Sequence, residues 1–228
     1  MDASKKTRPN MVITVDGPSG SGKSSISKKA AQDLGFNFLD TGAMYRSITW
    51  FCLQEKLVEE DEILQKLERD IFQLKISTNP EEESVIVNDV DVTRIIREDI
   101  ITSQVSKFSA LAGVRKFLVR LQRELVARSN TGIVVEGRDI GSVVLPDAPC
   151  KIFITATDAV RAQRRALQTN TDSNEVLVSQ RNRDKLDSTR TVSPLVVPKG
   201  AIILDNTNLD FDQSVAQFLE IVKAARDE

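Results

Sequence analysis

A short apolar run followed by a glycine-rich segment is the feature that most constrains how this chain folds. Residues 11–15 are apolar and partly β-branched, which predicts a buried strand leading into a turn. Residues 17–24 read GPSGSGKS and match the P-loop pattern, GxxxxGK followed by Ser or Thr, at every fixed position. Residues 24–34 contain neither Pro nor Gly and stop before Gly35, which predicts a helix ended by a glycine. The strand, loop and helix therefore follow in the order that phosphate binding requires.

This segment predicts a site for the phosphates of ATP with Mg²⁺. Glycines let consecutive backbone N–H groups turn toward phosphate oxygens, and the helix N-terminus adds the positive end of its dipole. Lys23 is expected to reach the β and γ phosphates, and the Ser24 hydroxyl to bind Mg²⁺. Asp16 is a candidate for holding a water of the Mg²⁺ shell, with a structural cap on the turn as the alternative. The expected ATP-binding residues are Gly17, Pro18, Ser19, Gly20, Ser21, Gly22, Lys23, Ser24 and Ser25.

The rest of the chain predicts an α/β fold, with a parallel sheet flanked by helices. Apolar runs recur at residues 132–135, 151–156 and 201–204, each bounded by Gly, Pro or Asp, and long helical patterns separate them. Residues 74–92 differ, because two β-rich runs flank a polar turn and predict an antiparallel hairpin in a small inserted lobe. Residues 114–128 carry apolar side chains at helical spacing and predict an amphipathic helix.

Composition and charge narrow the class of protein. The 31 Lys and Arg residues nearly balance the 33 Asp and Glu residues, which does not favour sequence-independent binding to a nucleic-acid backbone. No apolar run approaches the ~20 residues of a membrane span. Residues 1–10 lack the apolar core of a signal peptide, so we expect a cytoplasmic protein without a membrane partner. Cys52 and Cys150 lack metal-ligand spacing and are expected to be reduced packing residues.

A P-loop alone does not distinguish a kinase from a molecular switch or a motor. A guanine-reading switch needs an NKxD segment, and the nearest Asn-to-Asp spacing has Thr207 in place of Lys. The chain contains no His, which removes the commonest general base. It offers instead a series of arginines, namely Arg46, Arg138, Arg161, Arg164, Arg165, Arg181, Arg183 and Arg190. Converging arginines neutralise two phosphate-bearing substrates, so phosphoryl transfer between them is the favoured chemistry.

Four segments together resemble the bacterial cytidylate kinase family. They are the P-loop, LDTGAMYR at residues 39–46, EGRDIG at residues 136–141 and RDKLDSTR at residues 183–190. Their order and spacing agree with that family, and the resemblance spans residues 12–207. It implies transfer of the γ-phosphoryl group of ATP to CMP, and to dCMP, with Mg²⁺. It also implies the fold of nucleoside monophosphate kinases, with an acceptor-binding insert and a short lid.

The resemblance implies a role for each matching residue. The acceptor-binding residues would be Thr41, Tyr45, Arg46, Ser103, Arg115, Arg138, Asp139, Arg183, Asp187 and Arg190. The catalytic residues would be Lys23, Arg138, Arg161, Arg165 and Arg190. Arg46, Arg138 and Arg190 would hold the acceptor phosphate, with Thr41 and Tyr45 nearby.

The other implied contacts concern the sugar, the base and the lid. Arg183 and Asp187 would contact the ribose hydroxyls. The cytosine ring would be read by three residues, Ser103, Arg115 and Asp139. Arg161, Arg164 and Arg165 would lie on the lid helix near the transferring phosphate.

The expected organisation is one kinase domain. A disordered tail over residues 1–10 would precede a domain at residues 11–228, with its core at 11–59 and 111–228, the insert at about 60–110 and the lid at about 161–190. A monomer is expected, because no heptad or apolar face asks for a partner. The remaining alternatives are a kinase for another small acceptor, such as UMP, dTMP or shikimate, and a P-loop nucleotide switch without enzyme activity.

Overall fold

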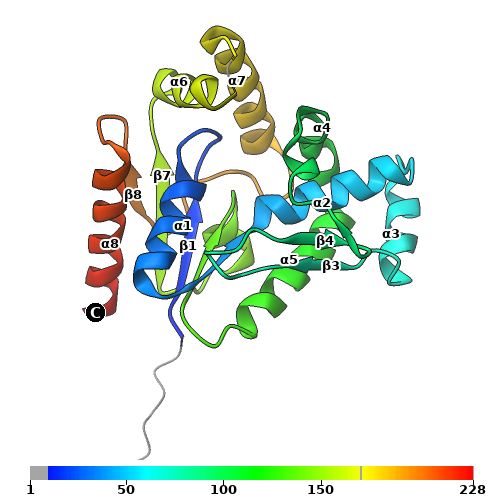
Figure 1. Ribbon diagram of the computed structural model, residues 1–228, viewed down its shortest axis with the longest axis horizontal. Coiled ribbons are helices and arrows are strands. Elements are labelled where there is room, and N and C mark those ends of the chain that lie inside the picture. Colours follow the sequence, from blue (N-terminus) through cyan, green and yellow to red (C-terminus); the bar gives the residue numbers. More distant parts are fainter. Residues whose placement is uncertain (1–9, 170, 228) are drawn as a thin grey trace, which may run out of the picture.

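The computed structural model of the chain describes residues 10–169 and 171–227 (Figure 1). The tail expected at residues 1–10 lies outside the described residues, apart from Asn10. The Asn10 side chain donates a hydrogen bond to the carbonyl of Ser129 at 2.8 Å. Across the described part of the chain, we find no helix with the length and apolar character needed to cross a bilayer.

The centre of the described part is a five-stranded sheet with strand order β2-β6-β1-β7-β8. Its strands are β1 (Val12–Asp16), β2 (Asn37–Asp40), β6 (Ile133–Glu136), β7 (Cys150–Thr155) and β8 (Ile202–Asp205). Every pair of neighbours is parallel, and Val15 on β1 lies opposite Glu136 on one side and Ile152 on the other. The predicted parallel sheet is therefore confirmed, with β2 as a strand that the apolar-run analysis did not include.

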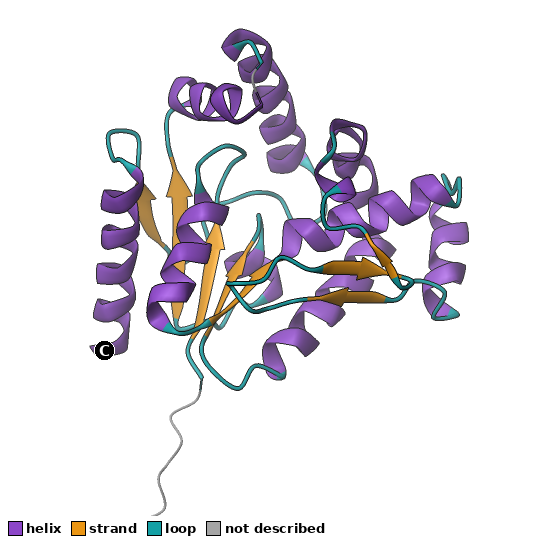
Figure 2. Ribbon diagram, in the orientation of Figure 1, coloured by secondary structure: helices purple, strands orange, loops and turns teal. Residues whose placement is uncertain are grey.

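Helices cover both faces of this sheet (Figure 2). Val134 belongs to the apolar core shared with α1 (Lys23–Leu34) and α8 (Phe211–Asp227). Its neighbours Ile133 and Val135 belong to the core shared with α2 (Thr41–Gln54) and α5 (Ala112–Ala127). Successive side chains of a strand point to opposite faces, so β6 contributes to both cores.

The inserted lobe packs on the second of these cores. It comprises α3 (Glu60–Glu68), β3 (Leu74–Ile76), β4 (Val85–Val87), β5 (Val90–Asp91), a 3₁₀ turn (Ile95–Arg97) and α4 (Asp99–Ser109). The predicted antiparallel hairpin is confirmed as β3 paired with β4. A tight turn at Asn88 and Asp89, with φ of 49° and 62°, adds the third strand β5.

Two further helices lie beyond the carboxyl ends of the strands, at the top of Figure 1. They are α6 (Asp158–Thr169) and α7 (Ser173–Thr189), which occupy the region expected to form the lid and are called the lid helices below. Asp172 caps α7, because its side chain accepts hydrogen bonds from the backbone N–H groups of Asn174 and Glu175.

Candidate active site

A cavity of about 1100 Å³ opens at the carboxyl ends of the parallel strands. Ligands of open α/β sheets bind at this edge, at the point where the order of the strands reverses. Here β1 lies between β6 and β7, and the P-loop that follows β1 forms the floor of the cavity. The insert, the end of β6 and the lid helices supply the other lining residues.

Glycines set the path of the P-loop. A Cβ on Gly17 would lie 2.1 Å from the carbonyl oxygen of Ile154 on β7, so no larger residue fits there. Gly22 has φ of 82° directly before α1, a left-handed conformation that glycine adopts readily. Of the expected ATP-binding residues, those lining the cavity are Ser19, Gly20, Gly22, Lys23, Ser24 and Ser25. Gly17, Pro18 and Ser21 are not among the lining residues.

Glu136, at the end of β6, is the partner of the side chains of both Lys23 and Ser24. The Ser24 hydroxyl donates to Glu136 Oε2 at 3.0 Å, and Lys23 Nζ lies 3.4 Å from Glu136 Oε1. Burial lowers the pKa of Lys23 to about 8, and the nearby Arg138 shifts it in the same direction. The ammonium group is therefore held with little solvation beside the phosphate cradle, where an added negative charge stabilises it.

The contacts of Asp16 support the structural role of the two that were considered. Its side chain is fully buried, and its two carboxylate oxygens accept hydrogen bonds from the N–H groups of Ile140 and Gly141 at 2.7 and 2.8 Å. Burial raises the pKa of Asp16 to about 7, against the opposing effect of these two amides. The Asp16 oxygens thus face the segment after β6, while Glu136 is the carboxylate that contacts Ser24.

The expected acceptor-phosphate arginine of α2 lies in an ion pair. Arg46 Nη2 lies 3.0 Å from Asp40 Oδ2, and the Asp40 side chain also caps α2 by accepting from the Ala43 N–H. Burial alone would raise the pKa of Asp40, but Arg46 and this amide hold it below its usual value. Thr41 lines the same part of the cavity and donates its hydroxyl hydrogen to the carbonyl of Glu136 at 2.7 Å.

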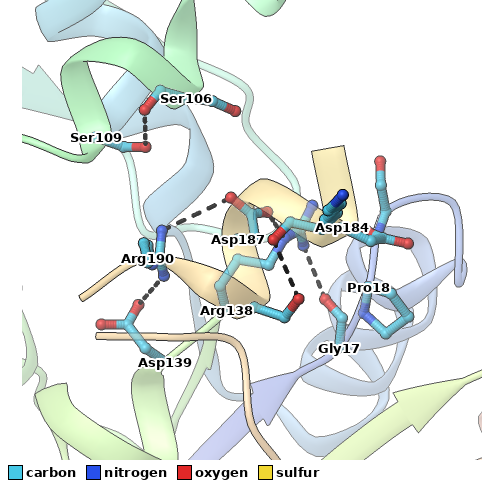
Figure 3. Close-up of polar contacts among 12 residues, drawn as sticks. Gly17, Pro18, Ser106, Ser109, Arg138, Asp139, Asp184, Asp187 and Arg190 are labelled. Carbon is cyan, nitrogen blue, oxygen red and sulfur yellow. Dashed lines mark hydrogen bonds and ion pairs between the residues drawn. The ribbon is translucent and has the colours of Figure 1, made fainter. Parts of the chain in front are cut away.

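Arg138 connects the P-loop to α7. Its Nη1 donates to the carbonyl of Gly17 at 2.9 Å, and its Nε donates to Asp187 Oδ2 at 3.1 Å. Arg190, at the end of α7, lies between Asp187 and Asp139, with nitrogen-to-oxygen distances of 3.7 Å to each (Figure 3). Burial lowers the pKa of Arg190, and Arg115 adds to the shift.

A buried ion pair closes the end of the cavity between α5 and the segment after β6. Arg115 Nη2 donates to Asp139 Oδ2, while Arg115 Nη1 donates to the carbonyl of Ser109 at 3.2 Å. The guanidinium lies 5.3 Å from the centre of the Tyr45 ring, and burial raises the pKa of the Tyr45 phenol to about 12. Arg115 and Asp139 are 2% and 3% exposed, so this pair offers fixed polar atoms in a site shielded from water.

Ser103 and Arg183 complete the expected acceptor set, and both line the cavity. Ser103 is exposed on α4, where its hydroxyl donates to the carbonyl of Ile100 at 3.2 Å. Burial lowers the pKa of Arg183 to about 10, with Arg138 adding to the shift. The Nε of Arg183 is buried without a hydrogen-bond partner among the described residues, which suits a group awaiting a ligand.

The three arginines of α6 divide into two with protein partners and one without. Arg161 is 5% exposed, and its guanidinium donates hydrogen bonds to two backbone carbonyls and two carboxylates of the protein. Arg164 donates to the side chain and carbonyl of Asn206 at 2.9 and 2.8 Å. Arg165 lines the cavity, and within residues 10–169 and 171–227 its side chain has no hydrogen-bond or ion-pair partner.

The sequence did not indicate the part of the cavity that is lined by the segment after β8. Asn206, after β8, donates from Nδ2 to the carbonyl of Ser21 at 2.9 Å and so holds the P-loop from behind. Leu209, Asp210 and Phe211 continue the lining on that side. Only the strand preceding them was visible in the sequence, because the asparagine and the apolar residues carry no motif of their own.

Comparisons with known proteins agree with this geometry. A family model described as cytidylate kinase matches residues 13–224. The chain is 42% identical to the cytidylate kinase of Carboxydothermus hydrogenoformans, over 95% of this chain and 99% of that protein. It is 41% identical to the cytidylate kinase of Caldanaerobacter subterraneus, over 92% and 94% of the two chains. The fold is similar to that of an uncharacterized protein from Eubacterium ventriosum, with a TM-score of 0.52, 13% identity and coverage of 94% and 99%.

Proposed function

The chain belongs to the cytidylate kinase family, and from this premise we propose that it transfers the γ-phosphoryl group of ATP to CMP, giving ADP and CDP. The observation that supports this most is the buried Arg115–Asp139 pair, which lines the same cavity as the P-loop. The cavity thus joins a phosphate cradle at one side to fixed polar atoms at the other. A phosphoryl donor and a nucleotide acceptor need this combination.

The reaction needs positioned charge more than a side-chain base. A phosphate oxygen of the acceptor is already a nucleophile, so catalysis rests on alignment and on neutralising the negative charge that two nucleotides bring together. Lys23 and Arg165 would neutralise charge on the transferring group. Arg46, Arg138 and Arg190 would hold the acceptor phosphate. We further propose that Arg183 and Asp187 contact the sugar, which makes dCMP a weaker acceptor than CMP if the 2′-hydroxyl is bound.

The base would be read at the Arg115–Asp139 pair. The carboxylate of Asp139 accepts a hydrogen bond from the amino group of cytosine, whereas the carbonyl of uracil at that position offers only lone pairs. Arg115 donates to Asp139 and so holds the carboxylate in place. A site built to pair one polar group rejects the mismatched analogue, because the buried group is then left without a partner.

We also propose Mg²⁺ as the metal of this site, and the residues present fit it. The Ser24 hydroxyl and the Glu136 carboxylate are hard oxygen donors 3.0 Å apart at the cradle. Mg²⁺ takes few protein oxygens and keeps waters and phosphate oxygens as its other ligands. When bound, the ion neutralises charge on the β and γ phosphates. Ser24 would hold it directly and Glu136 would hold its shell.

The enzyme would act as a monomer in the cytoplasm, without nucleic acid or membrane partners. Cys52 and Cys150 are free and buried, which suits a reducing compartment. The near balance of charge on the chain, with arginines gathered inside the cavity, favours small phosphorylated ligands over an extended polyanion.

The test is ADP formation from Mg-ATP with each of five acceptors, CMP, dCMP, UMP, dTMP and shikimate. We expect release with CMP to exceed release with the other acceptors, and release without an acceptor to be slow. Preference for UMP, dTMP or shikimate would assign a different kinase activity. Acceptor-independent release, or binding without release, would leave only a nucleotide switch.

A further inference from the structure

The lid helix α7 touches the P-loop through Asp184. The backbone N–H of Ser19 donates to Asp184 Oδ1 at 3.1 Å. The other oxygen, Oδ2, accepts from Arg161 Nη1 at 2.6 Å, and the same nitrogen donates to the carbonyl of Ser19 at 2.6 Å. Ser19, Asp184 and Arg161 therefore form a closed set of contacts, called the clasp below, that joins the P-loop, α7 and α6.

The remaining donors of Arg161 anchor the clasp to the core. Arg161 Nε donates to the carbonyl of Ala156, just after β7, at 3.1 Å, and Nη2 donates to Asp158 Oδ1 at 2.6 Å. Of its two carboxylate partners, Asp158 has a side chain that is 45% exposed and lies away from the P-loop, whereas that of Asp184 is 18% exposed. Of these two carboxylates, Asp184 is thus the one that contacts both Arg161 and Ser19.

The same face of α7 holds the P-loop at a second point. Asp187, one helical turn after Asp184, accepts from Arg138, which in turn donates to the carbonyl of Gly17 (Figure 3). One turn before Asp184, the side chain of Gln180 lies so close to Gly20 that a Cβ there would be 2.3 Å from its Nε2. The helix therefore follows the loop from Gly17 to Gly20.

Asp184 itself does not line the cavity, although its neighbours Arg183 and Asp187 do. A substrate contact is therefore not its role, and its carboxylate is shared between a backbone amide and a buried arginine. We propose that Asp184 is a positioning residue that fastens the lid onto the P-loop and thereby couples acceptor binding on α7 to the setting of the ATP site. This rests on the proposed function, since it takes α7 as the helix that binds the acceptor.

The consequence is control over where the phosphoryl group goes. With the clasp intact, an acceptor bound to Arg183 and Asp187 draws α7 against the loop that carries ATP, and water is excluded from the cavity. Without the clasp, α7 retains its acceptor contacts but no longer seats on Ser19. ATP is then turned over less efficiently, and a larger share of it is hydrolysed by water.

The experiment compares Asp184→Ala and the isosteric Asp184→Asn with Asp158→Ala, which removes a carboxylate from the same arginine without touching the P-loop. Formation of ADP and of CDP is measured separately with ATP and CMP. We expect Asp184→Ala to lower kcat by about tenfold or more and to raise the ratio of ADP to CDP above one. Asp184→Asn should shift the ratio in the same direction, and Asp158→Ala should keep both values within about twofold of the parent enzyme.

A second readout does not depend on CMP turnover. Hydrogen exchange of the Ser19 amide should become at least about tenfold faster in both Asp184 variants and stay unchanged in Asp158→Ala. If the parent enzyme did not phosphorylate CMP, the proposed function would fail, and amide exchange would still decide the clasp. If Asp184→Ala does not fold, the asparagine variant decides. An unchanged ADP-to-CDP ratio and unchanged exchange in a folded Asp184 variant, or equal effects in Asp158→Ala, would overturn the proposal.

Discussion

Lys23 carries a charge that burial disfavours in the free protein and that a bound phosphate would stabilise. The residue is 5% exposed, and among the described residues the carboxylate within ion-pair distance of its ammonium group is Glu136, at 3.4 Å. Burial lowers the pKa of Lys23 to about 8, so the charged form is disfavoured in the free enzyme. Since the unfolded chain keeps this proton up to a higher pH, the contribution of Lys23 to stability rises as pH rises through 8.

ATP binding should therefore become linked to protonation above pH 8. The phosphates stabilise the charged form and raise the pKa of Lys23, so binding takes up a proton wherever the free enzyme has lost it. We expect ATP affinity to be level between pH 7.5 and about pH 8 and then to fall by up to about tenfold per pH unit. Calorimetry from pH 7.5 to 9.5 measures this, with Lys23→Met as the control. Equal affinity at both ends of the range would remove Lys23 from the phosphate site.

The Arg115–Asp139 pair is the residue-scale basis of base selection. We expect Asp139→Asn and Arg115→Met to lower kcat/KM for CMP by at least about 1.4 kcal/mol, or tenfold, and to narrow the CMP-to-UMP ratio. Arg120→Met is the matched control, because Arg120 lies on the same helix with a side chain that is 70% exposed. Steady-state kinetics with both nucleotides decide the matter, and thermal unfolding checks that the variants fold. A ratio equal to that of the parent in both variants would place base reading elsewhere.

At the scale of elements, the insert is part of the main core. The Phe72 ring packs 5.3 Å from Phe51 on α2 and 6.1 Å from Phe117 on α5, measured between ring centres. Phe72→Ala should lower the free energy of unfolding by about 3 kcal/mol or more, because it leaves a cavity between three elements. Ile71→Ala, at a neighbouring exposed position, should change it by less than about 1 kcal/mol. Chemical denaturation measures both, and equal losses would contradict a shared core.

The strands show how much of the fold could be predicted from the sequence. The strands that became β1, β6, β7 and β8 are runs of apolar, mostly β-branched residues, so their pattern was visible. The four residues of β2 were not singled out, because Asn37 and Asp40 give it polar ends and its place beside β6 depends on long-range pairing. Similarly, β5 has two residues and exists through the turn at Asn88 and Asp89.

The site residues divide in the same way. Some are recognisable from the sequence, and others are known only from their contacts in the fold. The P-loop pattern identified Lys23 and Ser24, which line the cavity, and the family resemblance pointed to Arg115 and Asp139, which form a pair there. They did not predict that Glu136 is the shared partner of Lys23 and Ser24, although an acidic residue ending a strand next to β1 was a usable signal. The hydrogen-bond partners of the Asp16 and Asp184 side chains come from distant segments, and no local spacing encodes them.

At the scale of the whole molecule, three parts of the chain line one cavity. The P-loop supplies the phosphate cradle, the insert and α5 supply the polar end, and the lid helices cover the region between them. The arginines that line this space come from α2, the 3₁₀ turn of the insert, α5, the segment after β6, α6, α7 and the residue that follows α7. A chain with nearly balanced charge thereby concentrates positive groups where two nucleotides would bring negative ones.

The central claim is that the phosphoryl group passes directly from ATP to CMP within this cavity. The most direct measurement is transfer of label from ATP carrying ³²P in its γ-phosphate, with CDP and inorganic phosphate separated and counted. The account predicts that label appears in CDP as fast as ADP forms, and that Lys23→Met slows this transfer by orders of magnitude while the protein stays folded. Label that accumulates in inorganic phosphate at the same rate with and without CMP would contradict the account.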